Sequence, residues 1–123
     1  MKAWFIKFFK GFVYAFHGVL SGFSERNMQV HGVATVLVLC ASWYYHISAI
    51  EWMIILLLIA AVWSAEMVNT AIEEICNIMV DRNDLAYYVT TRARDVAAGS
   101  VLVFAVVAAV CAAIIFIPKL GFL

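Results

Sequence analysis

The sequence predicts an all-α integral membrane protein, in which an N-terminal amphipathic surface helix is followed by three transmembrane helices. Of its 123 residues, 67% are hydrophobic and 13% are charged, and the mean hydropathy is +1.00. This composition is far more apolar than that of an ordinary water-soluble domain. Three apolar windows, at about 30–50, 52–72 and 97–117, each have the roughly 20 residues that a helix needs to cross about 30 Å of hydrocarbon. We expect a single domain over residues 1–123, because no linker or repeat interrupts the chain.

The basic residues predict the orientation of these helices. Three crossings put the N-terminus and the connection at about 77–94 on one side of the membrane. Seven of the eight Lys and Arg fall on that side, and only Lys119 falls on the other; the seven are Lys2, Lys7, Lys10, Arg26, Arg82, Arg92 and Arg94. By the positive-inside rule, that side is cytoplasmic. The net charge of zero leaves no excess of positive charge for phosphates, so we expect no nucleic-acid partner.

Residues 2–22 have the pattern of a helix that lies in the membrane interface. Polar side chains recur every three or four positions and form one stripe, which consists of Lys7, Lys10, Tyr14, His17 and Ser21. The remaining positions are mostly Phe, Trp, Ile and Val, as in an interfacial helix. Since the polar residues interrupt the apolar ones and no small-residue cleavage site follows, we expect mature structure rather than a signal peptide.

Short polar segments are expected to separate the spans. The segment 23–29 turns the chain from the surface helix into the first span. The connection at about 46–51 is so short that the first two spans should form an antiparallel helical hairpin. Pro118 is expected to end the third span, with Lys119 just outside it.

Glu66 interrupts the second span and marks a candidate functional site. It lies about 21 Å of helix beyond Trp52, which places it in the inner leaflet. There a carboxylate costs a few kcal/mol unless it is paired, protonated or hydrated. At 100° per residue, Glu73 lies about 20° from Glu66 around the helix, Asn77 lies about 20° to the other side, and Asn69 lies about 60° away. These residues form one polar stripe, whereas Glu74, about 80° away, is expected to be a solvated neighbour.

Other charged residues reach the same membrane level from different directions. Glu25 directly precedes the first span, and Arg94 and Asp95 directly precede the third. Carboxylates and amides beside a guanidinium suit Mg²⁺-dependent phosphoryl transfer, because Mg²⁺ prefers oxygen ligands and transfer depends on positioning and charge neutralisation. The sequence has neither a G-x-x-x-x-G-K-[ST] loop nor G-x-G-x-x-G, so no P-loop or protein-kinase fold is expected.

The motifs of this site resemble those of a known family. The stretch Glu66-Met-Val-Asn69-Thr-Ala-Ile-Glu73, then Arg94-Asp95-Val-Ala-Ala-Gly99 and the closing Ile-Ile-Phe-Ile-Pro118-Lys, resemble the small prokaryotic diacylglycerol kinase family, especially its undecaprenol kinase branch. The likeness extends over nearly the whole chain. It implies a homotrimer in the prokaryotic cytoplasmic membrane, with composite active sites between subunits at the cytoplasmic interface. It also implies ATP as the phosphoryl donor, Mg²⁺ as the cofactor and a membrane lipid alcohol as the substrate.

The resemblance also implies roles for individual residues. Glu66 would be the catalytic base towards the lipid hydroxyl. Glu25 and Glu73 would be ligands of the metal that ATP carries. Asn69 would hold the headgroup and the local hydrogen-bond network.

The nucleotide side of the site departs from the family pattern at two positions. Asp95 and the basic residue before it, Arg94, are similar to the family's nucleotide contacts, but the family usually has Lys where Arg94 stands. Arg can still bind phosphate, often with two hydrogen bonds. The family usually has Asp where Asn77 stands, so a negative charge is missing here. The connection at about 78–94 is expected to be some three residues longer than usual, and Asp81 could take the place of that acid.

Several alternatives remain open from the sequence. Undecaprenol is favoured as the acceptor, and diacylglycerol is the alternative. A small proton-coupled transporter and a non-catalytic relative are the hypotheses from other functional classes. Among single residues, Asp95 could simply cap the third helix, Asn69 could be an interhelical hydrogen-bonding group, and His31 is expected to be an interfacial polar residue.

Overall fold

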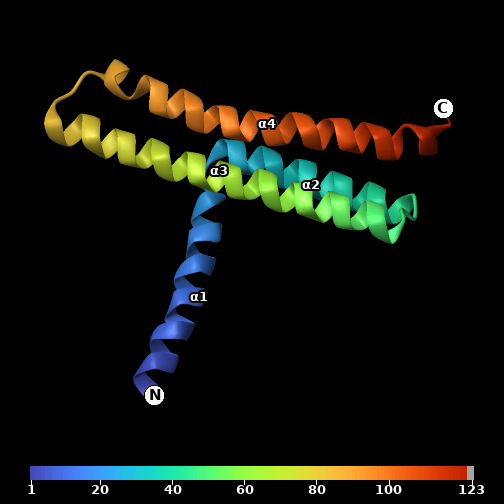
Figure 1. Cartoon of the computed structure of the whole chain (residues 1–123), viewed down its shortest axis with the longest axis horizontal. Coiled ribbons are helices and arrows are strands. Elements are labelled where there is room, and N and C mark those ends of the chain that lie inside the picture. Colours follow the sequence, from blue (N-terminus) through green and yellow to red (C-terminus); the bar gives the residue numbers. More distant parts are fainter. Residues whose placement is uncertain (122–123) are drawn as a thin grey trace.

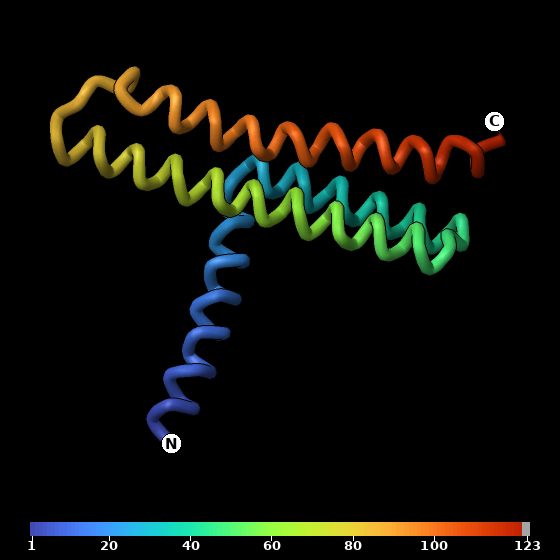
Figure 2. Tube along the Cα trace, in the orientation of Figure 1, coloured from blue at the N-terminus to red at the C-terminus, as the bar shows by residue number. Residues whose placement is uncertain are grey.

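All the regular secondary structure in residues 1–121, the part that the computed structural model describes, is helical, and no strand occurs in that part. Its elements are α1 (Lys2–Gly22), α2 (Arg26–Tyr44), α3 (Ala49–Asn83), the 3-10 turn η1 (Tyr87–Thr90), α4 (Thr91–Phe116) and the 3-10 turn η2 (Pro118–Leu120). Helices α2, α3 and α4 run lengthwise beside one another, with α3 packed against both of the others, while α1 projects steeply from the middle of this bundle (Figures 1 and 2).

The helix α1 touches the bundle only at its end. Gly22 is its single buried residue, and a Cβ placed there would lie 3.5 Å from Cγ of Met67 on α3. The Phe and Trp side chains along the rest of α1 are exposed, as a helix that buries one face in lipid requires. Its location on a membrane surface stays a prediction.

Two helical stretches are long and apolar enough to cross a membrane, Ala49–Asn83 and Tyr87–Leu120. They contain the predicted spans at 52–72 and 97–117. The predicted span at 30–50 corresponds to α2, which ends at Tyr44. By length and hydropathy, α2 is not among the helices that could cross a membrane. The reason is its first turns, where Arg26, Asn27, Gln29 and His31 lower the hydropathy. A crossing by α2 stays a prediction.

The predicted hairpin between the first two spans is present, since only residues 45–48 separate α2 from α3. Ser48 begins α3 with a capping box: its hydroxyl accepts a hydrogen bond from the Glu51 backbone N–H, and the Glu51 carboxylate accepts one from the Ser48 N–H. At the other end, Asp84 in the left-handed conformation (φ 50°) ends the helix.

The expected connection at about 77–94 is largely helical, and its position outside the membrane stays a prediction. The helix α3 has 35 residues and continues through Asn83, so Asn77 is helical and only residues 84–86 join α3 to η1. No Gly or Pro occurs between Glu66 and Asn83 to stop the helix. At 1.5 Å per residue α3 is about 52 Å long, which exceeds the roughly 30 Å of a hydrocarbon core. Part of α3 therefore extends beyond the membrane if it crosses one.

An ion pair closes the end of the bundle where α4 finishes. Lys119, which follows the predicted helix-ending Pro118, has its Nζ 2.9 Å from Oε1 of Glu51, just before the predicted span at 52–72. The helix α4 does end at Phe116, before Pro118. Hydrogen bonding from the Ser48 backbone and then from the Lys119 side chain holds the pKa of Glu51 below its ordinary value of 4.5.

We expect the pair to make a pH-dependent contribution to stability. A lowered pKa in the folded state means that the Glu51 interactions stabilise above the unfolded-state pKa and are lost as pH falls through the folded-state value. Lys119→Met should therefore lower the thermal unfolding temperature in detergent at pH 7, and the difference from the parent should shrink below pH 4.5. Lys10→Met, on α1 and remote from Glu51, is the control. A difference that stayed constant down to about pH 3 would contradict the assignment.

Candidate active site

The polar stripe predicted on α3 is present and faces the bundle. Glu66 and Asn69 are each only 3% exposed, and Glu73 is half-buried. Asn69 Nδ2 donates a hydrogen bond of 3.3 Å to Glu73 Oε1. Asn69 Oδ1 is buried, and no group within residues 1–121 donates to it. Since buried polar atoms are nearly always satisfied, this oxygen marks a place where a bound group would supply the partner.

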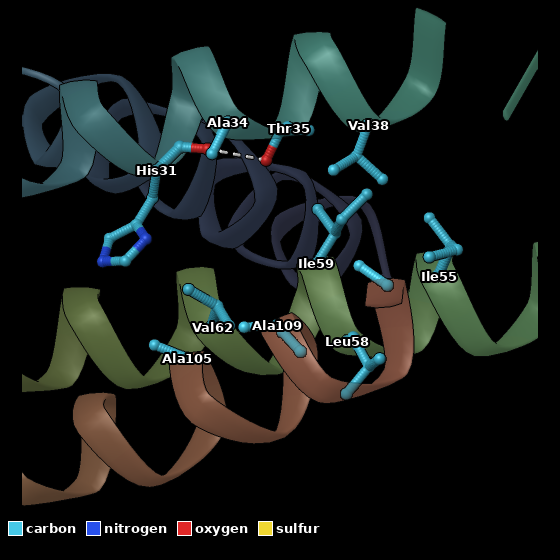
Figure 3. Close-up of a pocket in the computed structure, with 12 residues that line it drawn as sticks. His31, Ala34, Thr35, Val38, Ile55, Leu58, Ile59, Val62, Ala105 and Ala109 are labelled. Atoms are coloured by element: carbon cyan, nitrogen blue, oxygen red, sulfur yellow. Dashed lines mark hydrogen bonds between the residues drawn. The ribbon is translucent and has the colours of Figure 1, made fainter. Parts of the chain in front are cut away.

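Three helices meet at this stripe around a cavity of about 310 Å³. Asn27, Val30 and His31 line it from α2, Glu66 and Asn69 from α3, and Ala98, Val101, Leu102 and Ala105 from α4. A second cavity, of about 230 Å³, shares His31 and Ala105 with the first and continues along the bundle between apolar side chains such as Val38 and Leu58 (Figure 3). A carboxylate and an amide thus stand beside an apolar space, which is the environment that a lipid alcohol requires.

The structure adds His31 to the site, where the sequence indicated only an interfacial polar residue. Its Nε2 lies 3.9 Å from Glu66 Oε2, and its side chain is 22% exposed. The ring reaches from α2 towards α3 (Figure 3). One turn further along the hairpin, Trp63 Nε1 donates to Thr35 Oγ1 at 3.0 Å, which fixes how α2 and α3 face each other at this level. The contact between His31 and Glu66 could have been predicted by counting residues along both helices from the short connection of the hairpin.

Arg94 lies at the far end of the same stripe and is held from three directions. One terminal nitrogen donates to Asn77 Oδ1 at 2.9 Å, and Nε donates to Thr90 Oγ1 at 2.9 Å. The guanidinium carbon also lies 4.4 Å from the centre of the Tyr87 ring. The predicted proximity of Arg94 to the stripe is therefore present through Asn77. Sequence reasoning missed both Thr90 and Tyr87. The spacing of four residues between Thr90 and Arg94 is a signal that could have indicated the first contact, whereas the position of Tyr87 depends on the η1 turn.

The other two predicted site residues, Glu25 and Asp95, are exposed, and no hydrogen bond or ion pair within residues 1–121 engages either carboxylate. Glu25 is the N-cap residue of α2, but its side chain makes no capping hydrogen bond. Asp95 does not cap the third span, since Thr90 is the N-cap of α4 and Asp95 lies a turn further in. Asp81 is also exposed, one turn beyond Asn77 on α3.

The oxygens of the stripe fit a hard cation such as Mg²⁺. The Glu73 carboxylate lies beside the unpartnered Asn69 Oδ1, and both are oxygen donors of the type that Mg²⁺ prefers. Among the described residues of this one chain, no three His, Cys, Asp or Glu side chains are close enough to hold a metal ion. A cation here would need further ligands, such as the phosphates of a nucleotide.

Comparisons with known proteins agree with this chemistry. The chain is 42% identical to the undecaprenol kinase of Bacillus subtilis over 115 residues, which cover 93% of this chain and 91% of the relative. It is 32% identical to the diacylglycerol kinase of Synechocystis over 111 residues, which cover 89% of this chain and 62% of that relative. No solved structure matches the chain.

The family assignment removes the transporter alternative. The family model described as prokaryotic diacylglycerol kinase matches residues 13–116, a range that contains α2, α3, α4 and every predicted site residue. The expected resemblance is confirmed, and with it the expectation of a lipid kinase. This chain belongs to the prokaryotic diacylglycerol kinase family.

Proposed function

We propose that this protein transfers the γ-phosphoryl group of ATP to the hydroxyl of undecaprenol and produces undecaprenyl phosphate and ADP. The observation that carries the proposal is Glu66, a buried carboxylate in the wall of a cavity that shares two lining residues with an apolar one, in a chain of the lipid kinase family. The choice of undecaprenol is supported by the 42% identity with the Bacillus subtilis enzyme of that name.

Glu66 is the residue best placed to act as the base. Its carboxylate accepts the proton of the lipid hydroxyl as the oxygen attacks the γ-phosphorus, and the bond to the β-phosphate oxygen breaks to release ADP. His31 Nε2 lies 3.9 Å from the Glu66 carboxylate, in the wall of the same cavity. Asn69 orients Glu73 through its hydrogen bond and contributes an oxygen of its own to the site.

The nucleotide occupies the other end of the stripe in this proposal. Glu25 and Glu73 hold the Mg²⁺ of the nucleotide, and Arg94 and Asp95 contact the nucleotide itself, with Asn77 beside Arg94. Bound Mg²⁺ neutralises negative charge on the phosphates as transfer proceeds. The level of the site is consistent with a membrane interface, because α1 joins the bundle at Met67, next to Glu66.

The active form in this proposal is a homotrimer in the prokaryotic cytoplasmic membrane, with the N-terminus and the site on the cytoplasmic side. Two features support shared sites between subunits. Glu25 is exposed and engages no other side chain of its own chain within residues 1–121. The described residues of one chain also lack a complete set of protein ligands for a metal.

The test is a direct comparison of acceptors. Purified protein with ATP and Mg²⁺ should phosphorylate undecaprenol with a kcat/KM at least about tenfold higher than for diacylglycerol. Diacylglycerol is the second acceptor to test, because the Synechocystis relative is named a diacylglycerol kinase. Preference for diacylglycerol would reassign the substrate. Phosphorylation of neither lipid would leave a non-catalytic relative as the remaining hypothesis.

A further inference from the structure

We propose that Asn77, Thr90 and Tyr87 form a positioning clamp that fixes the Arg94 guanidinium for the phosphates of the nucleotide. The inference rests on the proposed function, since it assigns Arg94 to nucleotide phosphate. It adds two residues, Thr90 and Tyr87, that the motifs did not indicate. It also gives Asn77 a role that does not require the missing negative charge.

The three contacts constrain different parts of one side chain. Thr90 Oγ1 accepts from Nε at 2.9 Å, and Asn77 Oδ1 accepts from a terminal nitrogen at 2.9 Å. These bonds come from different helices, because Asn77 lies on α3 and Thr90 is the N-cap of α4. The guanidinium carbon also lies over the Tyr87 ring, 4.4 Å from its centre. The guanidinium is therefore restrained by two hydrogen bonds and by one aromatic contact.

Thr90 is itself held in place. It is 5% exposed, and its hydroxyl donates to the Tyr87 carbonyl oxygen at 3.1 Å while it accepts from Arg94. One hydroxyl therefore joins the η1 turn to the first turns of α4. Through Thr90, the Tyr87 backbone is connected to the same Arg94 guanidinium that lies over the Tyr87 ring.

The clamp leaves binding capacity on Arg94. A guanidinium has five N–H donors, and two of them are used here, so three stay free for oxygens of a ligand. Both acceptors are neutral, an amide and a hydroxyl, so the positive charge of Arg94 is oriented without being cancelled. A carboxylate at position 77 would hold the same nitrogen but would offset that charge. Planar, preoriented guanidinium groups bind phosphate with two parallel hydrogen bonds, and less conformational entropy is lost when they do so.

The clamp predicts a specific kinetic effect. Thr90→Val, which keeps the shape and removes the hydroxyl, and Asn77→Ala should each raise the KM for ATP about tenfold and leave kcat within a factor of about two. Tyr87→Leu should raise it about threefold, because an exposed cation–π contact is weak. Thr90→Ser and Tyr87→Phe, which keep the hydroxyl and the ring, should restore the parent KM.

Matched controls exist beside each clamp residue. Thr91→Val and Tyr88→Leu remove the same groups from adjacent positions, and Asn83→Ala removes an amide farther along α3. Among the described residues, none of these side chains hydrogen-bonds to Arg94 or forms a cation–π pair with it. Their KM for ATP should stay at the parent value. In an Arg94→Ala background, Thr90→Val should add no further increase, since the group that it positions is gone.

Equilibrium binding of ADP to the full-length protein, without lipid substrate, separates this inference from the proposed function. Weaker ADP binding in Thr90→Val, together with recovery in Thr90→Ser, would support the clamp even if no lipid were phosphorylated. Unchanged ADP binding and an unchanged KM in both Thr90→Val and Asn77→Ala would overturn it. So would an additive effect of Thr90→Val in the Arg94→Ala background.

Discussion

Glu66→Gln is expected to lower the rate of lipid phosphorylation by about a thousandfold, the magnitude typical of a lost general base. The amide keeps the volume of the carboxylate but cannot accept the proton of the lipid hydroxyl. The position is buried, at 3% exposure, and the near-isosteric change should leave the helices in place. The measurement is transfer of labelled γ-phosphate from ATP to undecaprenol by single-turnover kinetics, so that product release does not mask the chemical step.

Two controls interpret the result. Binding of ADP should be unchanged in Glu66→Gln, because Glu66 lies on the lipid side of the proposed site and Arg94 on the nucleotide side. The thermal unfolding temperature should also stay close to that of the parent. A variant with substantial turnover would show that another group takes the proton, and His31, 3.9 Å from the carboxylate, would be the first to examine.

Glu73→Gln is expected to reduce turnover about a hundredfold at ordinary Mg²⁺ concentrations and to raise the Mg²⁺ concentration needed for half-maximal rate. The reason is that an amide is a weaker ligand for a hard cation than a carboxylate is. The substituted side chain still has a carbonyl oxygen that can accept the hydrogen bond from Asn69, so the stripe should keep its geometry. A titration of rate against Mg²⁺ at fixed ATP measures the effect.

The neighbouring acid supplies the matched control for this prediction. Glu74 is exposed and lies about 80° from Glu66 around the helix, so Glu74→Gln removes the same charge from the same turn of α3 but outside the stripe. Its rate and its Mg²⁺ requirement should equal those of the parent. Equal effects of the two substitutions would show that the negative charge of this turn matters, and not metal coordination by Glu73. Glu73 would then be removed from the proposed metal site.

Helical periodicity predicted the α3 part of the site well. The 3.6-residue repeat placed Glu66, Asn69, Glu73 and Asn77 on one face; Glu66 and Asn69 are buried, Glu73 is half-buried and Asn77 is exposed. The repeat could do this because all of these residues lie on one uninterrupted helix. The same helical counting extends past the predicted span to Asn77 and Asp81, and α3 does continue to Asn83, because no Gly or Pro stops it.

Two contacts between elements were not predicted from the sequence. His31 meets Glu66 only because the α2–α3 hairpin has one particular register, and the Tyr87 ring meets Arg94 only because the η1 turn places it there. Residue types gave no sign of either contact. Glu25 illustrates the opposite case, since its proposed role came from a motif, and the single chain leaves its carboxylate exposed.

The unbroken course of α3 sets a fixed distance between its two ends. Glu51, paired with Lys119, and Glu66 are separated by about 22 Å of continuous helix, which cannot stretch. If α3 crosses the bilayer as predicted, the length of this helix fixes the distance between the outer headgroups and the Glu66 carboxylate. In a thicker bilayer the hydroxyl of a lipid at the inner surface would lie farther from Glu66 unless the bilayer thinned around the protein. Hydrophobic mismatch would thereby alter the reaction rate through the thickness of the bilayer, without a change in any side chain of the site.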